Sequence, residues 1–311
     1  MKIVLLGANG QLGRSFLLDR GLASLGTLIP VTRDGNLADG GHGETGDLAS
    51  LAGIRDLLER TRPDIIVNAA AYTAVDRAEQ EEDLATRVNG AALATIGEWA
   101  ARNRALVVHY STDYVFDGEA RHPYPTDAPT SPIGAYGRGK LAGERELRAS
   151  GAQHLILRTA WVYAAHGHNF LRTMLRLGAE RDQLRVVADQ HGAPTSTNLI
   201  VAGTVAALKR WLESPETVRG ELEGTHHLVA SGETTWHGFA SAIFDQALEH
   251  GLLARKPDVQ AIGTLDFPTP AKRPAFSVLD NTGFQKRFAF TLPHWSNGLT
   301  EVIRELSSKR S

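Results

Sequence analysis

The chain opens with MKIVLLGANGQLG, residues 1–13, in which an apolar run ends at a glycine-rich segment. Gly7, Gly10 and Gly13 follow a predicted strand and begin a predicted helix near 11–23. In dinucleotide-binding folds the first such glycine allows a tight turn, the second lets the backbone approach the pyrophosphate, and the third lets the helix pack closely on the strand. The helix N-terminus favours phosphate through its free N–H groups and its dipole. A ligand-free turn can also be rich in glycine, but this order of strand, motif and helix predicts a dinucleotide site.

Apolar runs rich in Val, Ile and Leu alternate with helical patterns beyond this motif. Such runs are typical of a parallel sheet covered by helices on both faces, and right-handed crossovers make it doubly wound. We expect an α/β, Rossmann-like domain over 1–165, with segments near 196–232 returning to it, and a smaller C-terminal substrate-binding lobe formed mainly by 166–311. The predicted strands are 2–6, 27–31, 64–70, 105–111, 154–163, 184–188 and 225–230, and the predicted helices lie near 11–23, 50–61, 83–102, 134–149, 168–181, 197–213, 234–250 and 295–308.

Composition narrows the classes of function. The 33 Lys and Arg side chains nearly balance the 35 Asp and Glu side chains, so the formal net charge of −2 gives no electrostatic reason to expect nucleic acid or an anionic membrane as partner. The absence of cysteine excludes disulfides, thiolate metal sites and cysteine nucleophiles. The first apolar run is too short for a signal peptide or a membrane span, and no later stretch approaches 18 uninterrupted apolar residues. These features predict a soluble, cytoplasmic protein.

The choice between NADPH and NADH is expected at the end of the second strand, in IPVTRDG, residues 29–35. An acidic residue there binds the ribose 2′-hydroxyl of NAD, whereas an arginine accommodates the 2′-phosphate of NADP. Thr32 and Arg33 precede Asp34, which favours NADPH. Asp34 keeps NADH open as the alternative, and an Arg33 that is merely solvated would favour neither cofactor.

Two further segments predict contacts with the same cofactor. GDL, residues 46–48, places Asp47 where its carboxylate would lie beside the adenine ring nitrogens. NAAAYT, residues 68–73, ends a predicted strand in small residues, which lets a cofactor lie close across the strand end. Each segment is a weak signal by itself.

The chemistry is predicted at VVHYSTDYVFDG, residues 107–118, and at IGAYGRGKLAGERE, residues 133–146. The first is a strand that ends in hydroxyls and an acid, and strand carboxyl ends line the ligand crevice of such sheets. The second places Tyr136 and Lys140 one helical turn apart, on one face of a helix. A turn cluster would explain the first segment, and a solvated helix face would explain the second. Their succession after the glycine motif favours a single site.

The three side chains of that site have complementary roles. A phenol has a pKa of about 10, and a neighbouring ammonium favours the phenolate. Tyr136 can therefore give a proton to a carbonyl oxygen while hydride reaches the carbonyl carbon. Lys140 can also hydrogen-bond the nicotinamide ribose, and Thr112 can hold the carbonyl oxygen in line. This arrangement predicts reduction of a ketone.

Several long segments together resemble one family of the extended short-chain dehydrogenase/reductases. NAAAYTAVDRAE, VVHYSTDYVFDG, YGRGKLAGE, RTAWVY, DQHGAPT and HHLVASGETTWHGFA are similar, in this order, to the dTDP-4-dehydrorhamnose reductases. The resemblance spans nearly the whole chain. It implies NAD(P)H-dependent reduction of the C4 keto group of dTDP-4-dehydro-β-L-rhamnose, the last step of dTDP-L-rhamnose synthesis.

The resemblance also implies roles for individual residues. Tyr136 would be the proton donor with Lys140 as its partner, and Trp161 would pack against the sugar or its diphosphate unless it is a plain core aromatic. Thr112, Asp113 and Tyr114 would contact the sugar. The other positions that match cofactor-binding positions of the family are Gln11, Leu12, Asp47, Leu48, Ala71, Tyr72, Thr73 and Tyr110.

The chain departs from the family at positions that imply a metal. Some members form dimers joined by Mg²⁺ that glutamates hold, and the corresponding positions here are Ser15, Asn198 and Ser296. None supplies the carboxylate oxygens that a hard cation prefers. We therefore expect no metal site of this kind, and a monomer or weak homodimer.

Two other functions stay open at the level of sequence. The first is a nucleotide-sugar epimerase or dehydratase of the same superfamily; Asp113 is followed by Tyr114 instead of a second carboxylate, which argues for simple reduction over dehydration. The second is a non-catalytic NADP-binding regulatory subunit of the methionine adenosyltransferase type. Turnover of a nucleotide-sugar ketone would distinguish an enzyme from such a subunit.

Overall fold

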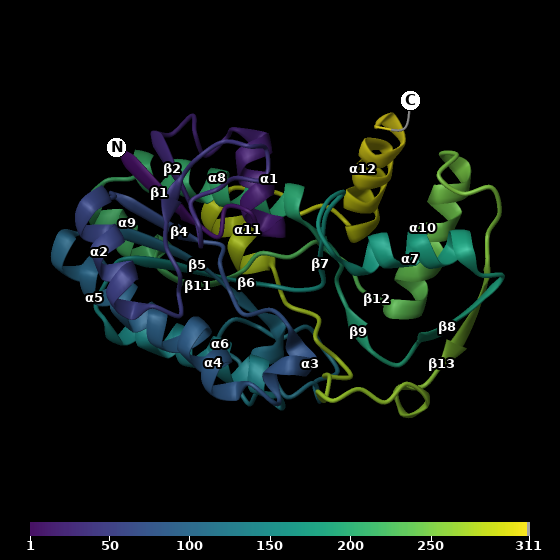
Figure 1. Ribbon diagram of the computed structural model, residues 1–311. Coiled ribbons are helices and arrows are strands. Elements are labelled where there is room, and N and C mark those ends of the chain that lie inside the picture. The colour runs from purple at the N-terminus through teal and green to yellow at the C-terminus, as the bar shows by residue number, and fades with distance from the viewer. Residues whose placement is uncertain (310–311) are drawn as a thin grey trace.

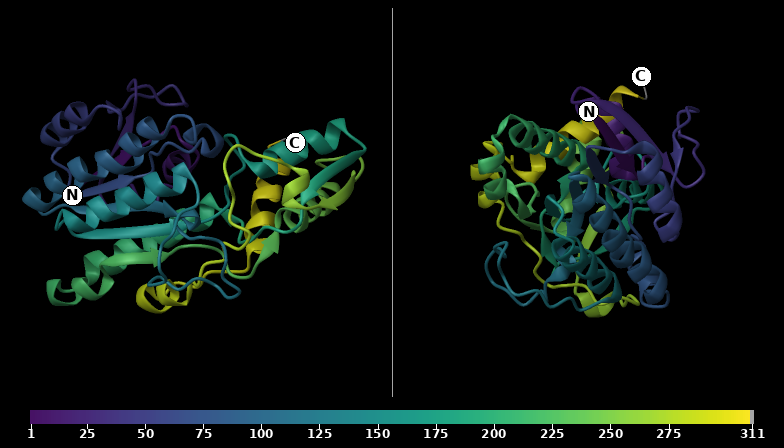
Figure 2. Two further views of the ribbon diagram at one scale, coloured as in Figure 1. Left: turned by 90° about the horizontal axis from the view of Figure 1, so that it is seen from below. Right: turned by 90° about the vertical axis from the view of Figure 1, so that its left-hand side faces the viewer.

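The computed structural model describes residues 1–309 of the chain, which form two parts that lie side by side (Figure 1). The larger part holds the N-terminus and the main sheet, and the smaller lobe holds the C-terminal helix. Figure 2 shows the two parts next to each other in the view from below. Their junction lies at the carboxyl ends of the sheet strands, and this is where the candidate site is found.

The main sheet has seven strands, and every pair of neighbours is parallel. The strand order reverses between β1 and β4, because β2 and β3 lie on one side of β1 and all later strands lie on the other. Such a reversal opens a ligand crevice at the carboxyl ends of the strands. The order across the sheet is β11 (Gly224–His227), β6 (His154–Thr159), β5 (Leu106–Thr112), β4 (Ile65–Asn68), β1 (Lys2–Leu6), β2 (Thr27–Thr32) and β3 (Glu44–Thr45).

Two hydrophobic cores cover the two faces of this sheet. Successive strand residues point to opposite faces, so Leu5 packs with Phe16 in one core and Leu6 packs with Leu57 in the other. The first core includes helices α1 (Gln11–Asp19), α8 (Thr197–Glu213) and α11 (Thr282–Phe288). The second includes α2 (Leu51–Thr61), α5 (Ala92–Asn103) and α6 (Ala135–Ala149). The predicted Rossmann-like, doubly wound fold is confirmed.

The smaller lobe has a core of its own. Phe239 and Phe244 on α10 (Trp236–Glu249) are fully buried with side chains of α7 (Phe170–Glu180) and α12 (Trp295–Ser308). A parallel pair of strands, β8 (Gln183–Val187) and β13 (Asp258–Ile262), completes it. The short elements elsewhere in the chain include α3 (Val75–Ala78), β7 (Val162–Tyr163), β9 (His191–Gly192), β10 (Thr195–Ser196), α9 (Glu216–Leu222), β12 (Thr234–Thr235) and the 3₁₀ helices η2 (Asp113–Val115) and η3 (Thr264–Asp266).

Two predicted elements are interrupted in the structure. The strand expected over 154–163 ends at Thr159, and the backbone of Trp161 takes a left-handed φ of 47° before β7 leaves the sheet. The helix expected near 83–102 consists of α4 (Glu82–Thr86), a π-helical turn η1 (Arg87–Ala91) and α5. At that turn the Asn89 side chain donates to the Tyr72 carbonyl and accepts from the Tyr72 N–H, so the irregular turn fastens the segment that follows β4.

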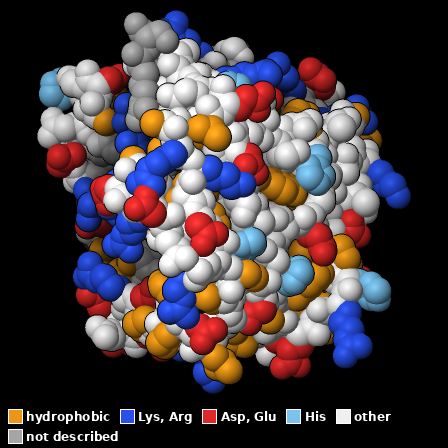
Figure 3. Space-filling view, turned by 90° about the vertical axis from the view of Figure 1, so that its right-hand side faces the viewer, with side chains coloured by type: hydrophobic (Ala, Val, Ile, Leu, Met, Phe, Trp, Pro, Cys, Tyr) orange, Lys and Arg blue, Asp and Glu red, His pale blue; other side chains and the backbone are white. Residues whose placement is uncertain are grey.

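The surface of the chain carries charges of both signs. Figure 3 shows the outer side of the smaller lobe, where basic and acidic side chains are interspersed with hydrophobic ones. Among residues 1–309, no helix combines the length and the apolar character that crossing a bilayer requires.

Candidate active site

A cleft of about 2370 Å³ lies between the carboxyl ends of the sheet strands and the smaller lobe. Of all residues predicted for cofactor, substrate or catalysis, only Gly13 is not among its lining. A Cβ atom at Gly13 would lie 2.1 Å from the Gly7 carbonyl oxygen, so this glycine lets α1 approach the loop. The predicted residues that line the cleft are Gly7, Gly10, Gln11, Leu12, Thr32, Arg33, Asp47, Leu48, Ala71, Tyr72, Thr73, Tyr110, Thr112, Asp113, Tyr114, Tyr136, Lys140 and Trp161.

The glycine loop has the geometry of a phosphate cradle. Gly7 has a φ of 78°, and a Cβ there would lie 2.8 Å from the Ala70 backbone at the end of β4. Gly10 is the N-cap of α1, where no side chain caps the helix and no acidic residue occupies the first turn. The first N–H groups of α1 are therefore left to an anion. These features fit the pyrophosphate of a dinucleotide.

The end of β2 presents a cation and an anion to the cleft. Arg33 is exposed on the cleft wall. The Asp34 carboxylate accepts hydrogen bonds from Asn36 and from the Thr32 hydroxyl, and these bonds lower its pKa. Asp34 and Thr32 are thus hydrogen-bonded to each other, whereas Arg33 is an exposed residue of the cleft lining. This geometry supports binding of a 2′-phosphate.

Two tyrosines predicted to touch the cofactor have their hydroxyls engaged elsewhere. Tyr72 donates to Glu81 Oε2 at 2.5 Å. The Tyr110 hydroxyl lies 2.8 Å from Thr204 Oγ1 of α8, and burial raises its pKa above the usual value. Tyr110 contributes its backbone to the site instead, because its carbonyl oxygen accepts a 2.6 Å hydrogen bond from Lys140 Nζ.

Thr112, Asp113 and Tyr136 meet where β5 ends and α6 begins. The Thr112 hydroxyl donates to Asp113 Oδ1 at 2.9 Å and accepts from the Tyr114 N–H, so its proton points to the carboxylate and not into the cleft. Burial raises the pKa of Asp113 to about 6. Tyr114 packs edge-on against the Tyr136 ring, with ring centroids 5.8 Å apart. These contacts hold the Tyr136 phenol beside one carboxylate and one hydroxyl.

The acid–base properties of Tyr136 and Lys140 differ from the expectation that the ammonium draws the phenol's pKa down. Burial, with a smaller contribution from the Asp113 charge, raises the pKa of Tyr136 to about 12. Burial also lowers the pKa of Lys140 to about 7. Desolvation disfavours the charged form of each group. In the free chain Tyr136 is therefore a fully protonated acid, and Lys140 titrates near neutrality.

Two tryptophans face each other in the cleft. Trp161 stacks on Trp236, with ring centroids 3.6 Å apart and planes 4° from parallel. Gly192 lies behind Trp161, since a Cβ there would come within 2.4 Å of the indole. Trp236 Nε1 donates to Gln190 Oε1 at 3.2 Å. The stack therefore joins the end of β6 to the first turn of α10 and forms an aromatic wall of the cleft.

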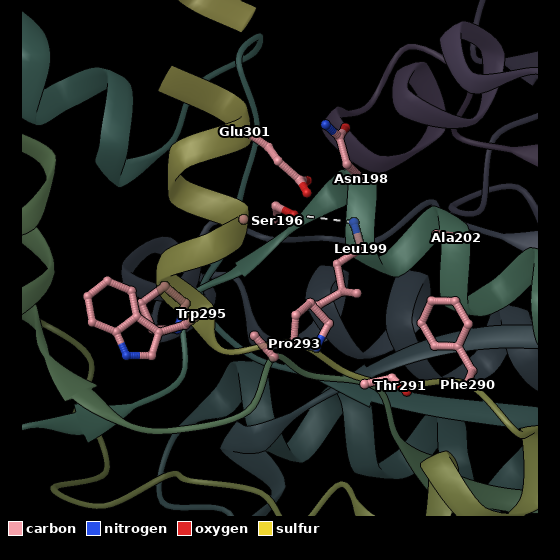
Figure 4. A pocket seen from close by; sticks show the side chains of 12 residues that line it. Ser196, Asn198, Leu199, Ala202, Phe290, Thr291, Pro293, Trp295 and Glu301 are labelled. Carbon is pink, nitrogen blue, oxygen red and sulfur yellow. Dashed lines mark hydrogen bonds between the residues drawn. The ribbon is translucent and has the colours of Figure 1, made fainter. Parts of the chain in front are cut away.

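A second hollow of about 380 Å³ lies between α8 and α12 (Figure 4). Asn198 and Glu301 lie at one end of it, so a carboxylate that the sequence analysis did not single out is near one of the three positions compared with metal ligands. Ser15 donates to Thr197 Oγ1 at 2.7 Å, and Ser296 Oγ lies 2.8 Å from His294 Nδ1. Within the described chain, no three His, Cys, Asp or Glu side chains gather as a metal site requires.

Comparison with known proteins agrees with this arrangement. A family model described as "RmlD substrate binding domain" matches residues 1–308. The chain belongs to this family. A curated relative from Salmonella typhimurium, named dTDP-4-dehydrorhamnose reductase, is 42% identical over 98% of this chain and 98% of its own length. A relative of the same name from Burkholderia thailandensis is 43% identical over 99% of this chain and 100% of its own length.

Solved structures named dTDP-4-dehydrorhamnose reductase share the whole fold. The dTDP-4-dehydrorhamnose reductase of Clostridium acetobutylicum superposes with a TM-score of 0.85 at 34% identity, covering 98% of this chain and 99% of its own. The enzyme of that name from Bacillus anthracis, solved in complex with NADP, gives a TM-score of 0.82 at 31% identity with the same coverage. The predicted family is thus confirmed.

Some residues of the site in this family member were not predicted from the sequence. Trp236 lies in HHLVASGETTWHGFA, whose similarity to the family was noted without a role for any residue. His109 lies in VVHYSTDYVFDG and contacts Lys140, and Asn68 lies in NAAAYTAVDRAE and contacts His109. Gln190 accepts a hydrogen bond from the Trp236 indole N–H. The similar segments marked the right regions, but no spacing in the sequence distinguishes these side chains from core residues.

Proposed function

We propose that the chain catalyses the NAD(P)H-dependent reduction of the C4 keto group of dTDP-4-dehydro-β-L-rhamnose to dTDP-L-rhamnose. The observation that carries the proposal is the grouping of Thr112, Tyr136 and Lys140 at the end of β5, on the wall of a cleft large enough for a dinucleotide and a nucleotide sugar. Relatives that are 42% and 43% identical over nearly their full lengths are named for this reaction.

The cofactor of this reaction is NADPH, with NADH as a weaker alternative. NADPH, when bound, supplies the hydride. The loop from Gly7 to Gly10 and the N-terminus of α1 would hold its pyrophosphate, because a side chain would fill the cradle at Gly7 and nothing caps α1. Arg33 would hold the 2′-phosphate through charge-assisted hydrogen bonds. The Bacillus anthracis relative was solved with NADP, which supports the same preference.

The catalytic work of the chain is to deliver one proton and to stabilise the charge that remains. With a pKa of about 12, the Tyr136 phenol carries its proton throughout the physiological range and gives it to the C4 oxygen as that oxygen gains negative charge. The phenolate left behind is stabilised by the positive charge of Lys140. The Thr112 hydroxyl donates to the Asp113 carboxylate, whose negative charge raises the pKa of Tyr136 and so keeps the phenol protonated before hydride transfer. So high a pKa makes the phenol a weak acid, so the proton moves only as the C4 oxygen becomes strongly basic in the transition state.

The substrate would lie between the Tyr136 phenol and the smaller lobe. Trp161 and Trp236 offer an apolar wall for the sugar, and Arg181 and Arg185 line the lobe side of the cleft, where cations suit a diphosphate. In this proposal residues 1–165, with the segments near 196–232, form the cofactor domain, and 166–311 mainly form the substrate lobe. The separate lobe core supports this division, although α11 also packs on the sheet. A cytoplasmic location and a monomer or weak homodimer stay predictions.

The decisive test is turnover of the keto sugar. Purified protein is mixed with NADPH and with dTDP-4-dehydro-β-L-rhamnose made by the preceding dehydratase and epimerase, and NADPH absorbance and the sugar product are followed. We expect stoichiometric loss of NADPH and formation of dTDP-L-rhamnose, with the Tyr136→Phe variant as the inactive control. Isomerisation without net loss of NADPH would indicate an epimerase. NADPH binding with no turnover of any keto sugar would indicate a regulatory subunit, and either outcome would refute the proposal.

A further inference from the structure

A chain of three buried polar side chains runs from β4 through β5 to the catalytic helix. Asn68 Nδ2 lies 3.1 Å from His109 Nδ1, and His109 Nε2 lies 3.3 Å from Lys140 Nζ. His109 is fully buried, and Asn68 and Lys140 are only 1% and 2% exposed. His109 does not line the cleft, so it acts on the reaction only through Lys140.

The orientation of Asn68 determines which histidine nitrogen carries the proton. Asn68 Oδ1 accepts a hydrogen bond from the Ala70 N–H at 3.2 Å, which turns the amide NH₂ toward His109. His109 Nδ1 is then an acceptor, and the proton of the neutral imidazole lies on Nε2, facing Lys140 Nζ. A neutral lysine amine can accept this proton. An ammonium cannot, because it has donors only.

Lys140 is able to occupy both charge states near neutrality. Burial lowers its pKa to about 7, and the charge that opposes this effect is Glu144, one turn further along α6. Glu144 is itself paired with Arg158 of β6 and with Arg148. Burial and the Lys140 charge lower the pKa of His109 well below its usual value, so the imidazole stays neutral.

The other charged groups around α6 have partners or act elsewhere. Glu82 of α4 pairs with Arg138 on the exposed side of α6. Asp113, in the 3₁₀ turn η2 (Asp113–Val115), acts on Tyr136 and Tyr114. The remaining contact of the lysine is the Tyr110 carbonyl, which accepts at 2.6 Å and bears no charge. His109 is therefore the one neighbour of Lys140 that can act either as donor or as acceptor among the contacts that the described residues make with it.

We propose that His109 is a positioning residue whose tautomer changes with the charge of Lys140, so that the buried lysine keeps its hydrogen bond in both charge states. When Lys140 is an ammonium, its N–H donates to His109 Nε2, the ring proton lies on Nδ1, and the Asn68 amide turns to accept it. When Lys140 is a neutral amine, His109 carries the proton on Nε2 and donates to Nζ. The proposal rests on the proposed function, because it assigns Lys140 to the support of Tyr136.

The two states differ by one proton. On going from the charged to the neutral state, Lys140 changes from –NH₃⁺ to –NH₂ and one proton leaves to solvent, while His109 holds a single ring proton throughout. No bond between heavy atoms forms or breaks. The change lets Lys140 keep its hydrogen bond to His109 in both charge states, which avoids an unpaired group on the buried lysine. In the ammonium state the turned Asn68 amide gives up the hydrogen bond that it accepts from the Ala70 N–H.

The first experiment observes the tautomer directly in the free protein. The chain has 12 histidines, and in a sample labelled with ¹⁵N-histidine the His109 ring signals are assigned by their loss in His109→Gln. As pH rises through the Lys140 titration, we expect the Nδ1 and Nε2 shifts to move in opposite directions, as a change of tautomer requires. In Lys140→Met the His109 signals should not move. Signals that stay fixed in the wild type, or that both move toward the protonated value, would overturn the proposal.

The second experiment compares kcat/KM across pH for the wild type, His109→Leu and His109→Gln. Leucine removes the acceptor and leaves one ammonium N–H unpaired in the interior, so the pH above which activity falls should move down by about one unit or more. Glutamine keeps both a donor and an acceptor, and the profile should return to within about 0.3 unit of the wild type. NADPH affinity, measured by fluorescence, reports whether each variant is folded.

The outcomes separate this proposal from the proposed function. A wild type without reductase activity refutes the proposed function, while the tautomer measurement still decides the role of His109. An active wild type together with a folded His109→Leu that keeps the same pH profile refutes the role of His109 alone. If His109→Leu does not fold, the comparison of wild type, His109→Gln and Lys140→Met by ¹⁵N shifts decides.

Discussion

The sheet half and the smaller lobe bring their residues to the cleft in different ways. In the sheet half, the site residues follow strand ends directly: Gly7 follows β1, Arg33 follows β2 and Thr112 ends β5. In the lobe, Trp236 begins α10, lines the cleft and stacks on Trp161, which follows the end of β6. Strand ends are placed by the backbone ladder, whereas the lobe residues are placed by side chains that touch across the junction.

This difference implies a division of labour between the two halves. Groups that must be held to a fraction of an ångström, such as the proton donor and the phosphate cradle, lie on the rigid sheet and on α6. Trp236, Arg181 and Arg185, which we propose to contact the sugar nucleotide, lie on the lobe, where the core is smaller and separate. Variants on the sheet side should therefore affect the chemical step or the cofactor, and variants on the lobe side should affect substrate affinity.

The largest effect is expected for Tyr136→Phe. The change removes the proton donor and keeps the ring, so kcat should fall by roughly a hundredfold or more while the dissociation constant of NADPH stays the same. Steady-state kinetics and fluorescence titration measure the two quantities. Tyr114→Phe, which alters the neighbouring tyrosine, is the matched control and should keep most of kcat. Near-normal turnover by Tyr136→Phe would assign the acid to another group.

Raising the pH should reduce activity through the same site. Since burial places the pKa of Lys140 at about 7, the ammonium is present below that pH and is lost above it. Tyr136 stays protonated over the same range. We expect kcat/KM, which reports groups of the free enzyme, to fall by up to about tenfold per pH unit above neutrality. A profile that is flat to about pH 9 would show that the charge of Lys140 is not required.

Replacing Arg33 by alanine tests the cofactor side of the comparison. The guanidinium should favour the 2′-phosphate by about 1–2 kcal/mol, because its exposure limits the gain, and this corresponds to a roughly five- to thirtyfold preference for NADPH over NADH. The ratio of kcat/KM for the two cofactors should drop by that factor in Arg33→Ala. An unchanged ratio would mean that Arg33 is only a solvated charge. Asp34→Ala serves as a control for the ribose hydroxyls.

Trp236→Ala tests the lobe side. Loss of the aromatic partner of Trp161 removes an interaction worth about 0.5–1.5 kcal/mol, so KM for the sugar nucleotide should rise roughly two- to tenfold. The dissociation constant of NADPH should not change, because the indole lies on the far side of the junction. If the dissociation constant of NADPH rose as much as KM, the proposal that the lobe side affects substrate affinity alone would be wrong.

The smallest effect is expected from removing metal. No carboxylate is provided by Ser15, Asn198 or Ser296, and Glu301 supplies one carboxylate to the hollow. A hard divalent cation prefers several oxygen ligands with charge. EDTA should therefore leave both activity and the elution volume in size-exclusion chromatography unchanged. A loss of activity that Mg²⁺ restores would contradict this expectation.

The sheet half was the more predictable of the two from the sequence. The glycine spacing, the apolar strands and the pair Tyr136–Lys140 all act over a few residues, so their pattern is visible in the chain. What the sequence could not provide was the burial of Lys140 and Tyr136, which reverses the expected direction of the phenol's pKa. Desolvation depends on what packs around a group in three dimensions.

The lobe and the irregular turns were less predictable for a related reason. Trp161 takes a left-handed backbone that propensity disfavours, and it is held there between Gly192 and Trp236, which are far away in the sequence. The π-helical turn at Asn89 depends on a contact with Tyr72. The return of α11 to the sheet is decided by Phe284 and Phe288, whose apolar pattern alone does not say which core they join.

The lobe core is assembled from three separate stretches of chain, around Tyr163–Val186, Phe239–Leu253 and Leu299–Ile303, with sheet elements in between. Dividing the chain at any single position therefore separates residues that belong to the same core. A chimaera that borrowed the sugar specificity of a relative would have to exchange all three stretches together, because a single crossover would join half of one core to half of another. Point changes along the cleft wall are the shorter route by which such a protein can acquire a new sugar.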